Sequence, residues 1–391
     1  MTMRPCWAEI SAQSLEDNYR FLVNLAAGNA EVLAMVKADA YGHSLALCAP
    51  AAMRAGARWL GVTSVDEAVE TRALCPEARV LVMSGCFPGE GAAVLEHRLT
   101  PVAWEAWQLD ELESAAQAAG AAPSSIGIHL EIDTGMSRQG VPPENLAAVL
   151  QRFSASSPLR IEGVLTHLFA ADESDGRATE AQLARLDQAL AQIADAGLNP
   201  EWLSVGASAT LLNGYAARLA ALAASRGMKA MIRPGLALYG VAPPFVPDEP
   251  AAVANARLRL KPVLGWKTRV VSLRSVPAGA VVGYNGTFVA TEPMRLALLP
   301  VGYADGLDRR LGNHFSLMVR GQRAPLVGRV SMDLAVIDVT EIDGVEAGDE
   351  VVILGPQGAE TITAADHAEA SGTIAWEVLT RIGARVRRVL V

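Results

Sequence analysis

The sequence predicts an α/β plus β protein: an N-terminal (β/α)₈ barrel of the TIM type over residues 12–241 and a mainly β domain over residues 242–391. Two domains are expected because 391 residues are many for a single core. Through the first domain, apolar runs of strand length recur about every 20 to 35 residues, separated by segments with helical periodicity. A proline-rich connector, residues 241–250, ends this alternation, and strand runs follow it.

The chain opens with a short strand expected at residues 6–11 and a helix that starts near Gln13. Residues 32–36 are aliphatic without a polar break, which suits a strand that is buried on both faces and ends at Lys37. The other strands expected in the barrel are residues 59–63, 79–83, 99–103, 126–133, 161–167, 202–206 and 231–239. Together they make about eight strands, the number that a parallel barrel requires.

Segments rich in alanine, leucine and glutamate, such as residues 64–74 and 179–196, supply the helices between these strands. In a (β/α)₈ barrel, the functional groups gather at the carboxyl ends of the strands. Polar or charged residues fall at or just after such ends: Lys37, Arg138, His167, Ser208 and Arg233. We therefore expect these side chains to share one mouth of the barrel.

Beyond the connector, the pattern changes to strands separated by tight turns such as Asn285-Gly286. The expected strands are residues 262–276, 294–300, 316–319, 324–339 and 350–354. One closing helix is expected over residues 364–381, with Gly383 just past its end. The second domain is therefore predicted to be mainly β.

Composition and charge exclude several classes of function. Hydrophobic residues make up 51% of the chain and charged residues 19%, which favours a large folded core over disorder. The net charge of −9, without a basic stripe, argues against a nucleic acid partner and favours a small-molecule substrate. No apolar run is long enough for a membrane span, and the N-terminus lacks the apolar core of a signal peptide.

Cysteine usage indicates the compartment. The chain has four cysteines, Cys6, Cys48, Cys75 and Cys86, without C-x-x-C spacing and without nearby histidines in a pattern suited to zinc. We therefore expect no metal site, and we expect reduced thiols in the cytoplasm.

Lys37 is the residue with the most informative position. Desolvation at the end of a buried strand disfavours the ammonium and lowers the pKa, so the amine is partly free to attack a carbonyl and form a Schiff base. The alternative is a lysine whose stem packs in the core while its head reaches water. The strand alone leaves both interpretations open.

The stretch from Val36 to His43, VKADAYGH in one-letter code, closely resembles the signature of alanine racemases. The resemblance implies that Lys37 carries pyridoxal 5′-phosphate and that Tyr41 binds the cofactor phosphate. It also implies that the N-terminal strand within residues 1–11 joins the β domain. Similar matches recur along nearly the whole chain.

A second match covers residues 133–140, DTGMSRQG, whose glycine-flanked turn is suited to aim Arg138 into the barrel mouth. The alternative is an arginine on a solvated loop. The segment resembles the family motif in which this arginine touches the phenolic oxygen of the cofactor and helps hold the substrate carboxylate. Arg138 inherits that role as an expectation.

Glu131 departs from the family pattern. Many alanine racemases carry at this position a carbamylated lysine, an anion that orients the arginine. A glutamate supplies the same charge without added carbon dioxide, and we expect a charge-assisted pair with Arg138. The alternative is a glutamate that only faces solvent.

Two further residues follow strand ends. His167 is in isolation typical of a satisfied polar residue, but the stretch from Thr166 resembles the family segment whose histidine hydrogen-bonds the catalytic tyrosine. Ser208 opens a helix after small residues, a geometry suited to phosphate or to an ordinary cap. The resemblance implies a phosphate contact for Ser208, although Ala207 replaces the usual asparagine.

Arg233 stands within an apolar strand without an adjacent carboxylate. The resemblance implies that it hydrogen-bonds the pyridine nitrogen of the cofactor and that the amides after it, at Gly235 and Leu236, contact the phosphate. An arginine stays protonated, so it leaves the pyridine nitrogen unprotonated. The ring is then a weaker electron sink, which disfavours side reactions such as transamination.

Four expected site residues lie in the second domain. Tyr284 is by itself typical of a half-buried strand residue, but it resembles the family's second catalytic base, which reaches the partner subunit and so requires a homodimer with shared active sites. The resemblance places Tyr303 at the substrate entrance and assigns carboxylate binding to the amide of Met332. Trp376 replaces a phosphate-binding tyrosine, and its indole can donate one hydrogen bond but cannot accept.

The resemblance as a whole implies a pyridoxal-phosphate-dependent alanine racemase that supplies D-alanine for peptidoglycan. Lys37 is expected to serve the D-enantiomer and Tyr284 of the neighbouring chain the L-enantiomer. Two bases are needed because a planar carbanion that is reprotonated from the side it left keeps its configuration. The alternatives are a racemase of broader specificity, for serine or lysine, and a barrel protein that binds the cofactor without turnover.

Overall fold

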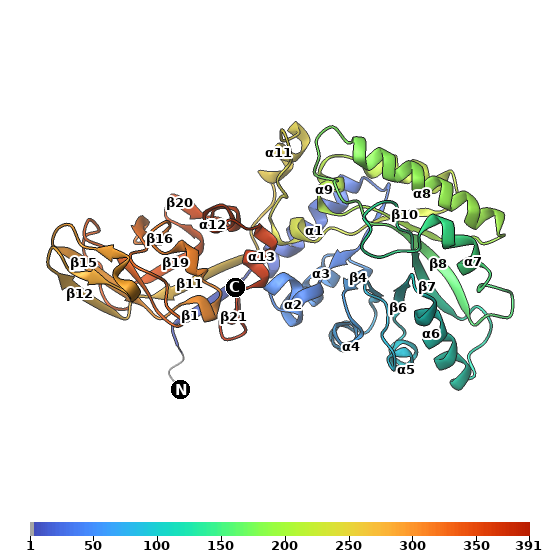
Figure 1. Ribbon diagram of the computed structural model, residues 1–391, viewed down its shortest axis with the longest axis horizontal. Coiled ribbons are helices and arrows are strands. Elements are labelled where there is room, and N and C mark those ends of the chain that lie inside the picture. Colours follow the sequence, from blue (N-terminus) through green and yellow to red (C-terminus); the bar gives the residue numbers. More distant parts are fainter. Residues whose placement is uncertain (1–3) are drawn as a thin grey trace. The chain divides into compact units, whose positions relative to one another are not determined.

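The computed structural model describes residues 4–391 (Figure 1). The chain divides into two compact units. The barrel unit comprises residues 13–40 and 48–261. The β unit comprises residues 41–47, residues 262–391 and the described chain up to Ala12. Each unit is described by itself below.

The barrel unit is built on one parallel sheet of nine strands in the order β2-β10-β9-β8-β7-β6-β5-β4-β3. The strands are β2 (Glu31–Val32), β3 (Ala34–Met35), β4 (Trp59–Val62), β5 (Arg79–Val82), β6 (Thr100–Ala103), β7 (Ile126–Glu131), β8 (Leu159–Leu165), β9 (Trp202–Ser204) and β10 (Lys229–Ile232). All neighbouring pairs are parallel, as the alternation of strands and helices predicts.

The two ends of this sheet are two halves of one strand. β2 pairs with β10 and β3 pairs with β4, and Leu33 between them donates its amide to Ile232 O at 2.9 Å. This continuous stretch therefore closes the barrel, and it leads directly into Lys37. Counting it once gives eight strand positions, which confirms the predicted fold class.

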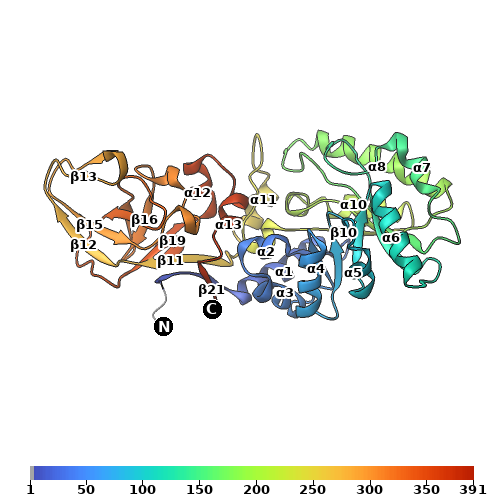
Figure 2. The same ribbon diagram turned by 60° about the horizontal axis from the view of Figure 1, so that its bottom comes forward.

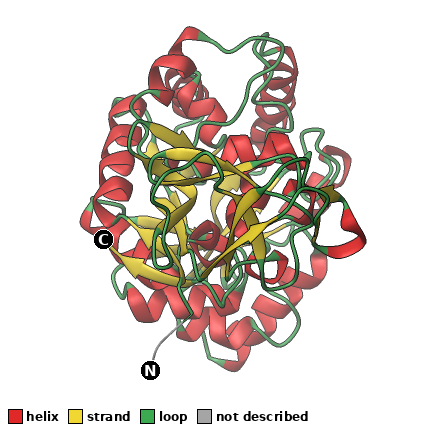
Figure 3. Cartoon of the chain, turned by 90° about the vertical axis from the view of Figure 1, so that its left-hand side faces the viewer, coloured by secondary structure: helices red, strands yellow, loops and turns green. Residues whose placement is uncertain are grey.

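The longer helices lie around the outside of the barrel strands (Figure 3). The helical segments up to residue 257 are α1 (Ala12–Ala26), α2 (Lys37–Gly42), α3 (Leu45–Arg54), α4 (Val65–Leu74), α5 (Gly91–Glu96), α6 (Ala106–Ala118), η1 (Pro143–Asn145), α7 (Leu146–Leu150), α8 (Arg177–Asp195), α9 (Ser208–Leu212), α10 (Ala216–Ala224), η2 (Leu236–Tyr239) and α11 (Ala251–Arg257). Aliphatic side chains fill the core, and Leu60, Leu81 and Ile128 are completely buried. The barrel is thus a packed core whose function must lie at its ends.

The β unit contains three sheets. The first has seven strands: β17 (Gln322–Pro325), β16 (Ser316–Val319), β19 (Glu350–Gln357), β11 (Leu264–Arg269), β1 (Cys6–Ile10) and β21 (Arg387–Leu390) in that order, with β20 (Glu360–Ile362) beside β19. The others are β12 (Ser272–Val276), β15 (Met294–Leu299) and β18 (Ala335–Asp338), and the hairpin β13 (Val281–Val282) and β14 (Phe288–Val289). Its helical segments are η3 (Tyr284–Gly286), η4 (Tyr303–Asp305), η5 (Arg309–Leu311), α12 (Ala364–Ser371) and α13 (Ala375–Thr380).

The N-terminal strand β1 pairs antiparallel with β11 and parallel with β21 (Figure 2). Its alternating burial, with Cys6, Ala8 and Ile10 buried, matches one face turned to the core. The first and last strands of the described chain are therefore neighbours in one sheet of the β unit.

Several expected elements differ in length or number from the observed ones. The strand expected at 231–239 ends at Ile232, because Pro234 lacks an amide donor and the chain turns into η2. The closing helix expected over 364–381 is two helices, since Gly372 adopts the left-handed region at φ 64° between α12 and α13. The expected strands 262–276 and 324–339 are each two strands: β11 and β12 lie in the first range, and β17 and β18 lie at the two ends of the second.

Candidate active site

Lys37 follows the closing strand of the barrel and opens α2. The strand before it is fixed from two sides, because Tyr19 Oη donates to Val32 O and Tyr239 Oη donates to Met35 O, each at 2.9 Å. Both phenols are buried. These contacts hold the backbone that carries the lysine.

The backbone after Lys37 is unusual, because the residues from Ala38 to Gly42 all have positive φ, between 51° and 79°. A left-handed turn of this length costs about 1–2 kcal/mol for each residue other than glycine. It is held by Glu67, whose carboxylate accepts the amides of Ala38 at 2.7 Å and Thr63 at 2.8 Å. Such strain is typical of a functional position. This turn could not be predicted from the residue types, since Gly42 alone favours this conformation.

Burial lowers the pKa of the Lys37 amine, and the positive charges of Arg138 and Arg233 lower it further. The nearby carboxylate of Glu67 acts in the opposite direction. The amine therefore has more of its neutral, nucleophilic form than an ordinary lysine. This favours the reactive interpretation of Lys37 over a solvated head group.

Arg233 follows β10 and is 3% exposed. Its guanidinium donates to Ser204 Oγ at 2.8 Å and to Thr166 O at 2.9 Å. Burial lowers its pKa to about 10, while Glu131 acts to raise it. The guanidinium of Arg233 therefore remains a cation at neutral pH. Its orientation is fixed by Ser204, the last residue of β9, and by Thr166, the residue after β8.

His167 lies beside Arg233, whose Nη2 is 3.5 Å from His167 Nδ1. Burial lowers the pKa of this histidine to about 3, and Arg233, Arg138 and Lys37 contribute in the same direction. His167 is therefore neutral at physiological pH. Since arginine can only donate, Nδ1 is the acceptor in this weak contact and the proton belongs on Nε2.

Glu131 ends β7 and is 2% exposed, so the solvent-facing alternative is wrong. Burial raises the pKa of its carboxyl. Its hydrogen bond comes from Gln139 Nε2 at 2.6 Å, whereas the described residues show no hydrogen bond from Arg138. The prediction of a charge-assisted pair between Glu131 and Arg138 is therefore wrong, because the hydrogen-bond partner of Glu131 is Gln139. Arg138 lies on an exposed turn organised by Asp133, and it acts on Glu131 through its charge.

Gln139 is a site residue that the sequence did not indicate. Besides its bond to Glu131, its amide nitrogen lies 3.4 Å from Met83 O. An isolated glutamine carries no signal for such a role, because its partners are set by the turn that brings it over the barrel.

Ser208 joins two further turns of the barrel unit. Its buried Oγ accepts the amides of Gly235 at 3.2 Å and Ala237 at 3.1 Å. The first residue of α9 therefore touches the start of η2, where Leu236 is the first helical residue. Backbone amides at such turns are suited to bind phosphate.

The donor set of the barrel unit fits pyridoxal phosphate. The partly neutral amine of Lys37 suits an aldehyde, the cations of Arg138 and Arg233 suit an anionic ring and carboxylate, and the turns joined by Ser208 suit a phosphate. Within residues 4–391, no group of three or more histidine, cysteine, aspartate or glutamate side chains is placed to hold a metal ion.

The remaining expected residues lie in the β unit. Tyr41 is 8% exposed, and burial raises its pKa to about 12. Trp376 is a half-buried residue of α13. Tyr303 is 43% exposed on η4 and Met332 is 54% exposed.

Tyr284 is 69% exposed on η3, the turn between β13 and β14. Gly283 at φ 74° and Asn285 at φ 61° shape this turn. The interpretation of Tyr284 as a half-buried strand residue is therefore wrong. An exposed phenol at the tip of a hairpin is available to a second molecule.

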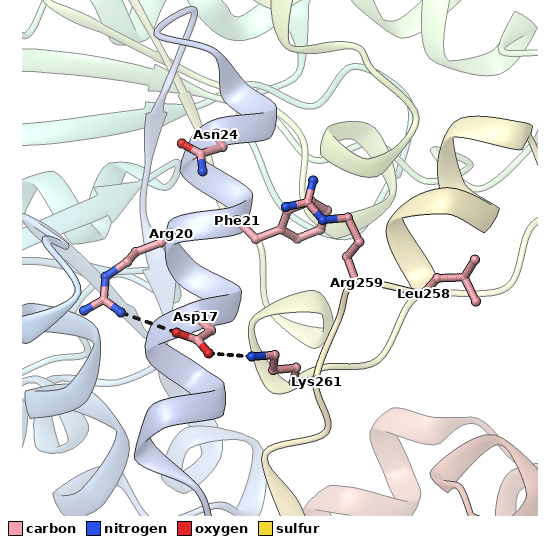
Figure 4. A pocket seen from close by; sticks show the side chains of 7 residues that line it. All are labelled: Asp17, Arg20, Phe21, Asn24, Leu258, Arg259 and Lys261. Atoms are coloured by element: carbon pink, nitrogen blue, oxygen red, sulfur yellow. Dashed lines mark hydrogen bonds and ion pairs between the residues drawn. The ribbon is translucent and has the colours of Figure 1, made fainter.

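A surface pocket of about 430 Å³ lies apart from these residues, between α1 and the segment after α11 (Figure 4). Its cations are partly neutralised, because Asp17 pairs with Lys261 at 2.7 Å and with Arg20 at 3.6 Å. None of the expected site residues lines it. We therefore assign the chemistry to the strand ends and not to this pocket.

Within residues 4–391, no helix combines the length and apolar character that crossing a membrane requires.

Comparison with known proteins connects both units to one family. Residues 10–243 match the profile described as alanine racemase, N-terminal domain, and residues 263–390 match alanine racemase, C-terminal domain. An alanine racemase of Syntrophobacter fumaroxidans is 35% identical over 381 residues, which cover 97% of this chain and 96% of that protein.

Solved structures agree. The crystal structure of alanine racemase from D-cycloserine-producing Streptomyces lavendulae has a TM-score of 0.88 and 34% identity, covering 100% of this chain and 98% of that chain. The structure of alanine racemase from Bartonella henselae with covalently bound pyridoxal phosphate has a TM-score of 0.83 and 28% identity, covering 99% of both chains.

Proposed function

The chain belongs to the alanine racemase family of pyridoxal-phosphate-dependent isomerases, and on that premise we propose a two-base exchange of L- and D-alanine by Lys37 and Tyr284. The observation that carries the proposal is the Lys37 amine, held at the end of the strand that closes the barrel, with its pKa lowered by burial and by Arg138 and Arg233. The proposed cofactor-binding residues besides Lys37 are Tyr41, Arg138, His167, Ser208, Arg233, Gly235, Leu236 and Trp376. Those proposed for the substrate are Arg138, Tyr303 and Met332.

The reaction requires that the proton on the α-carbon of alanine leave from one face and return on the other. When bound, pyridoxal phosphate withdraws electrons from this carbon and makes its proton acidic enough to remove. Lys37 takes or gives the proton on one face, and its lowered pKa places it closer to the operating pH. Tyr284 does so on the opposite face.

Arg233 tunes the reaction through its permanent charge. It remains protonated at neutral pH and is oriented by Ser204 and Thr166. A protonated guanidinium at the ring nitrogen of the bound cofactor would keep that nitrogen free of a proton, which would limit electron withdrawal. This favours racemisation over transamination.

We propose a homodimer in which Tyr284 serves the partner's site. The support is the exposure of Tyr284, Tyr303 and Met332, which leaves these side chains accessible to another subunit. Residues 12–241 would bind the cofactor, and residues 242–391, with the strand of residues 1–11, would present Tyr284. The four cysteines are buried and none forms a disulfide, which fits a reducing cytoplasm, where D-alanine would feed peptidoglycan synthesis.

The direct test is a racemisation assay by chiral separation, with L-alanine, L-serine and L-lysine compared. We expect L-alanine to be preferred, whereas equal turnover of the larger substrates would favour a broad-specificity racemase. The holoenzyme should absorb at about 420 nm, as expected for a protein-linked cofactor. This band should vanish in Lys37→Ala, and it should persist in Tyr284→Phe while racemisation is lost.

A further inference from the structure

Asp305 is a buried carboxylate that the proposed reaction does not use. It ends η4, the short helix that carries Tyr303, and its side chain is completely buried. Arg4 donates to its two oxygens at 2.6 and 2.9 Å, and Arg385 does so at 2.7 and 3.3 Å. The amide of Gly302 adds a fifth hydrogen bond at 2.8 Å.

This set of donors keeps the carboxylate ionised. Burial alone would raise the pKa of Asp305, but the hydrogen bonds from Arg385 and Arg4 and from the Gly302 amide lower it below its ordinary value. Charge-assisted forks of this type fix geometry in both partners. Asp305 therefore holds one segment ahead of β1 and one ahead of β21 against η4.

The same two arginines continue to the loop that carries Met332. Arg4 Nη2 donates to Asp333 O at 2.8 Å, and Arg385 Nη2 donates to the carboxylate of Asp333. The guanidinium groups thus bridge Asp305 to the residue directly after Met332.

The backbones of the two exposed turns are also joined directly. Tyr303 N donates to Ser331 O and Ala304 N donates to Met332 O, each at 3.0 Å. The approach is so close that a Cβ on Gly302 would collide with the carbonyl oxygens of Ser331 and Met332. A shift of η4 therefore moves the Met332 backbone with it.

We propose that Asp305 is a positioning residue for substrate, because it fixes the mutual placement of Tyr303 and the Met332 amide. The inference rests on the proposed function, in which these two groups form the substrate entrance and bind the substrate carboxylate. Their side chains are 43% and 54% exposed, so little packing holds them in place. The buried ion network beneath supplies the rigidity that the exposed turns lack.

The test is Asp305→Asn in the full-length holoenzyme. Asparagine keeps the shape and one acceptor oxygen but removes the charge that binds two guanidinium groups. We expect KM for L-alanine to rise about tenfold, while kcat changes less than about threefold. The inhibition constant of propionate, which is alanine without its amino group, should rise in parallel with KM because both depend on the carboxylate site.

Asp308→Asn is the matched control. Asp308 lies three residues further along and pairs with Arg310 at 2.7 Å, and within residues 4–391 it forms no hydrogen bond or ion pair with the Met332 loop. Its KM and propionate inhibition should equal those of the unchanged protein. Equal values for Asp305→Asn and the control would overturn the proposal, as would a fall in kcat with KM and propionate inhibition unchanged.

Arg385→Lys decides the question if Asp305→Asn does not fold. Lysine keeps the charge at this half-exposed position but cannot bridge Asp305 and Asp333 with a planar fork. KM should rise about threefold, with the cofactor band retained. An unchanged KM in folded Arg385→Lys would contradict the inference. Failure of the proposed function is separate, because it would show as absent racemisation in the unchanged protein.

Discussion

The amine of Lys37 is subject to three influences that lower its pKa: burial and the charges of Arg138 and Arg233. In the cofactor-free protein, the rate of capture of pyridoxal phosphate should rise with pH, because the neutral amine is the nucleophile. The pH at which this rate reaches half of its maximum, the midpoint, should lie below the pKa of an ordinary lysine. Arg138→Gln removes one cation, so the midpoint should move to higher pH.

The measurement is the growth of the band at about 420 nm after rapid mixing, over a range of pH. Arg226→Gln is a suitable control, since Arg226 pairs with Asp187 away from Lys37. It should leave the midpoint unchanged. A midpoint that stays constant or falls in Arg138→Gln would show that this guanidinium does not act on the lysine.

Glu131 illustrates a conflict between stability and function at one residue. Burial raises the pKa of its carboxyl, so the folded state binds a proton more tightly than the unfolded state does. Its contribution to stability is therefore present at low pH and lost as the pH rises through the raised folded pKa. Glu131→Gln keeps an acceptor for Gln139 and removes the buried charge, so the melting temperature at pH 7 should rise.

The same variant should racemise alanine more slowly, by roughly tenfold, because Arg233 and Arg138 lose a neighbouring anion. Calorimetry and the chiral assay on one preparation check both effects. A lower melting temperature at pH 7 would contradict the argument from burial.

Prediction from sequence worked for residues whose position is set by the strand pattern. Lys37, His167 and Arg233 follow strands recognisable from apolar runs, and the barrel geometry then brings them together. It failed for the partner of Glu131, because the turn geometry that selects Gln139 over Arg138 depends on backbone angles and not on residue type.

At the level of elements, the left-handed turn of α2 gives a sharp test at Gly42. Gly42 has φ 79°, and a Cβ there would collide with the carbonyl oxygen of Leu379. Gly28 has a similar φ of 74°, but a Cβ added there would have no other atom within 4 Å. Both alanine variants should lose about 1–2 kcal/mol of unfolding free energy through the left-handed backbone.

Gly42→Ala should lose about 1–3 kcal/mol more than Gly28→Ala, because overpacking adds to the strain. Urea unfolding followed by fluorescence gives the difference between the two variants. An equal loss of unfolding free energy in the two variants would contradict this prediction, because it would mean that the backbone near Leu379 moves to accommodate the added methyl group.

Element boundaries were harder to predict than element types. The break between α12 and α13 depends on Gly372, a residue that helices sometimes tolerate, so the helical pattern alone did not reveal it. The end of β10 was signalled by Pro234 and Gly235, but the apolar residues after them obscured the change to η2.

On the scale of the whole molecule, the proposed sharing of sites between subunits has a quantitative signature. Lys37→Ala and Tyr284→Phe should each be inactive. A mixed dimer of the two variants contains one site with both bases intact, because each subunit supplies the base that the other lacks. After random exchange half the dimers are mixed, so about a quarter of the full activity should return.

Unfolding and refolding the two variants together, followed by the chiral assay, measures this recovery. Refolding each variant alone provides the baseline. Continued inactivity of a mixture that sizing shows to be dimeric would place both bases in one chain.

The two-unit organisation was predictable because the proline-rich connector separates two different periodicities. The strands that pair with β1 could not be predicted, because pairing between strands far apart in the chain produces no local sequence pattern. The family resemblance implied only that this strand joins the β domain, and its pairing with β11 and β21 is seen in the structure.

The position of β1 between β11 and β21 in the sheet affects how the nascent chain folds during synthesis. β21 leaves the ribosome about 380 residues after β1, on the order of 20–80 s later at common translation rates. During that interval the edge of β1 that later pairs with Arg387–Leu390 has unsatisfied backbone hydrogen-bonding groups. A nascent chain with such an open edge is exposed to aggregation, and we expect a holding chaperone to lengthen its productive lifetime.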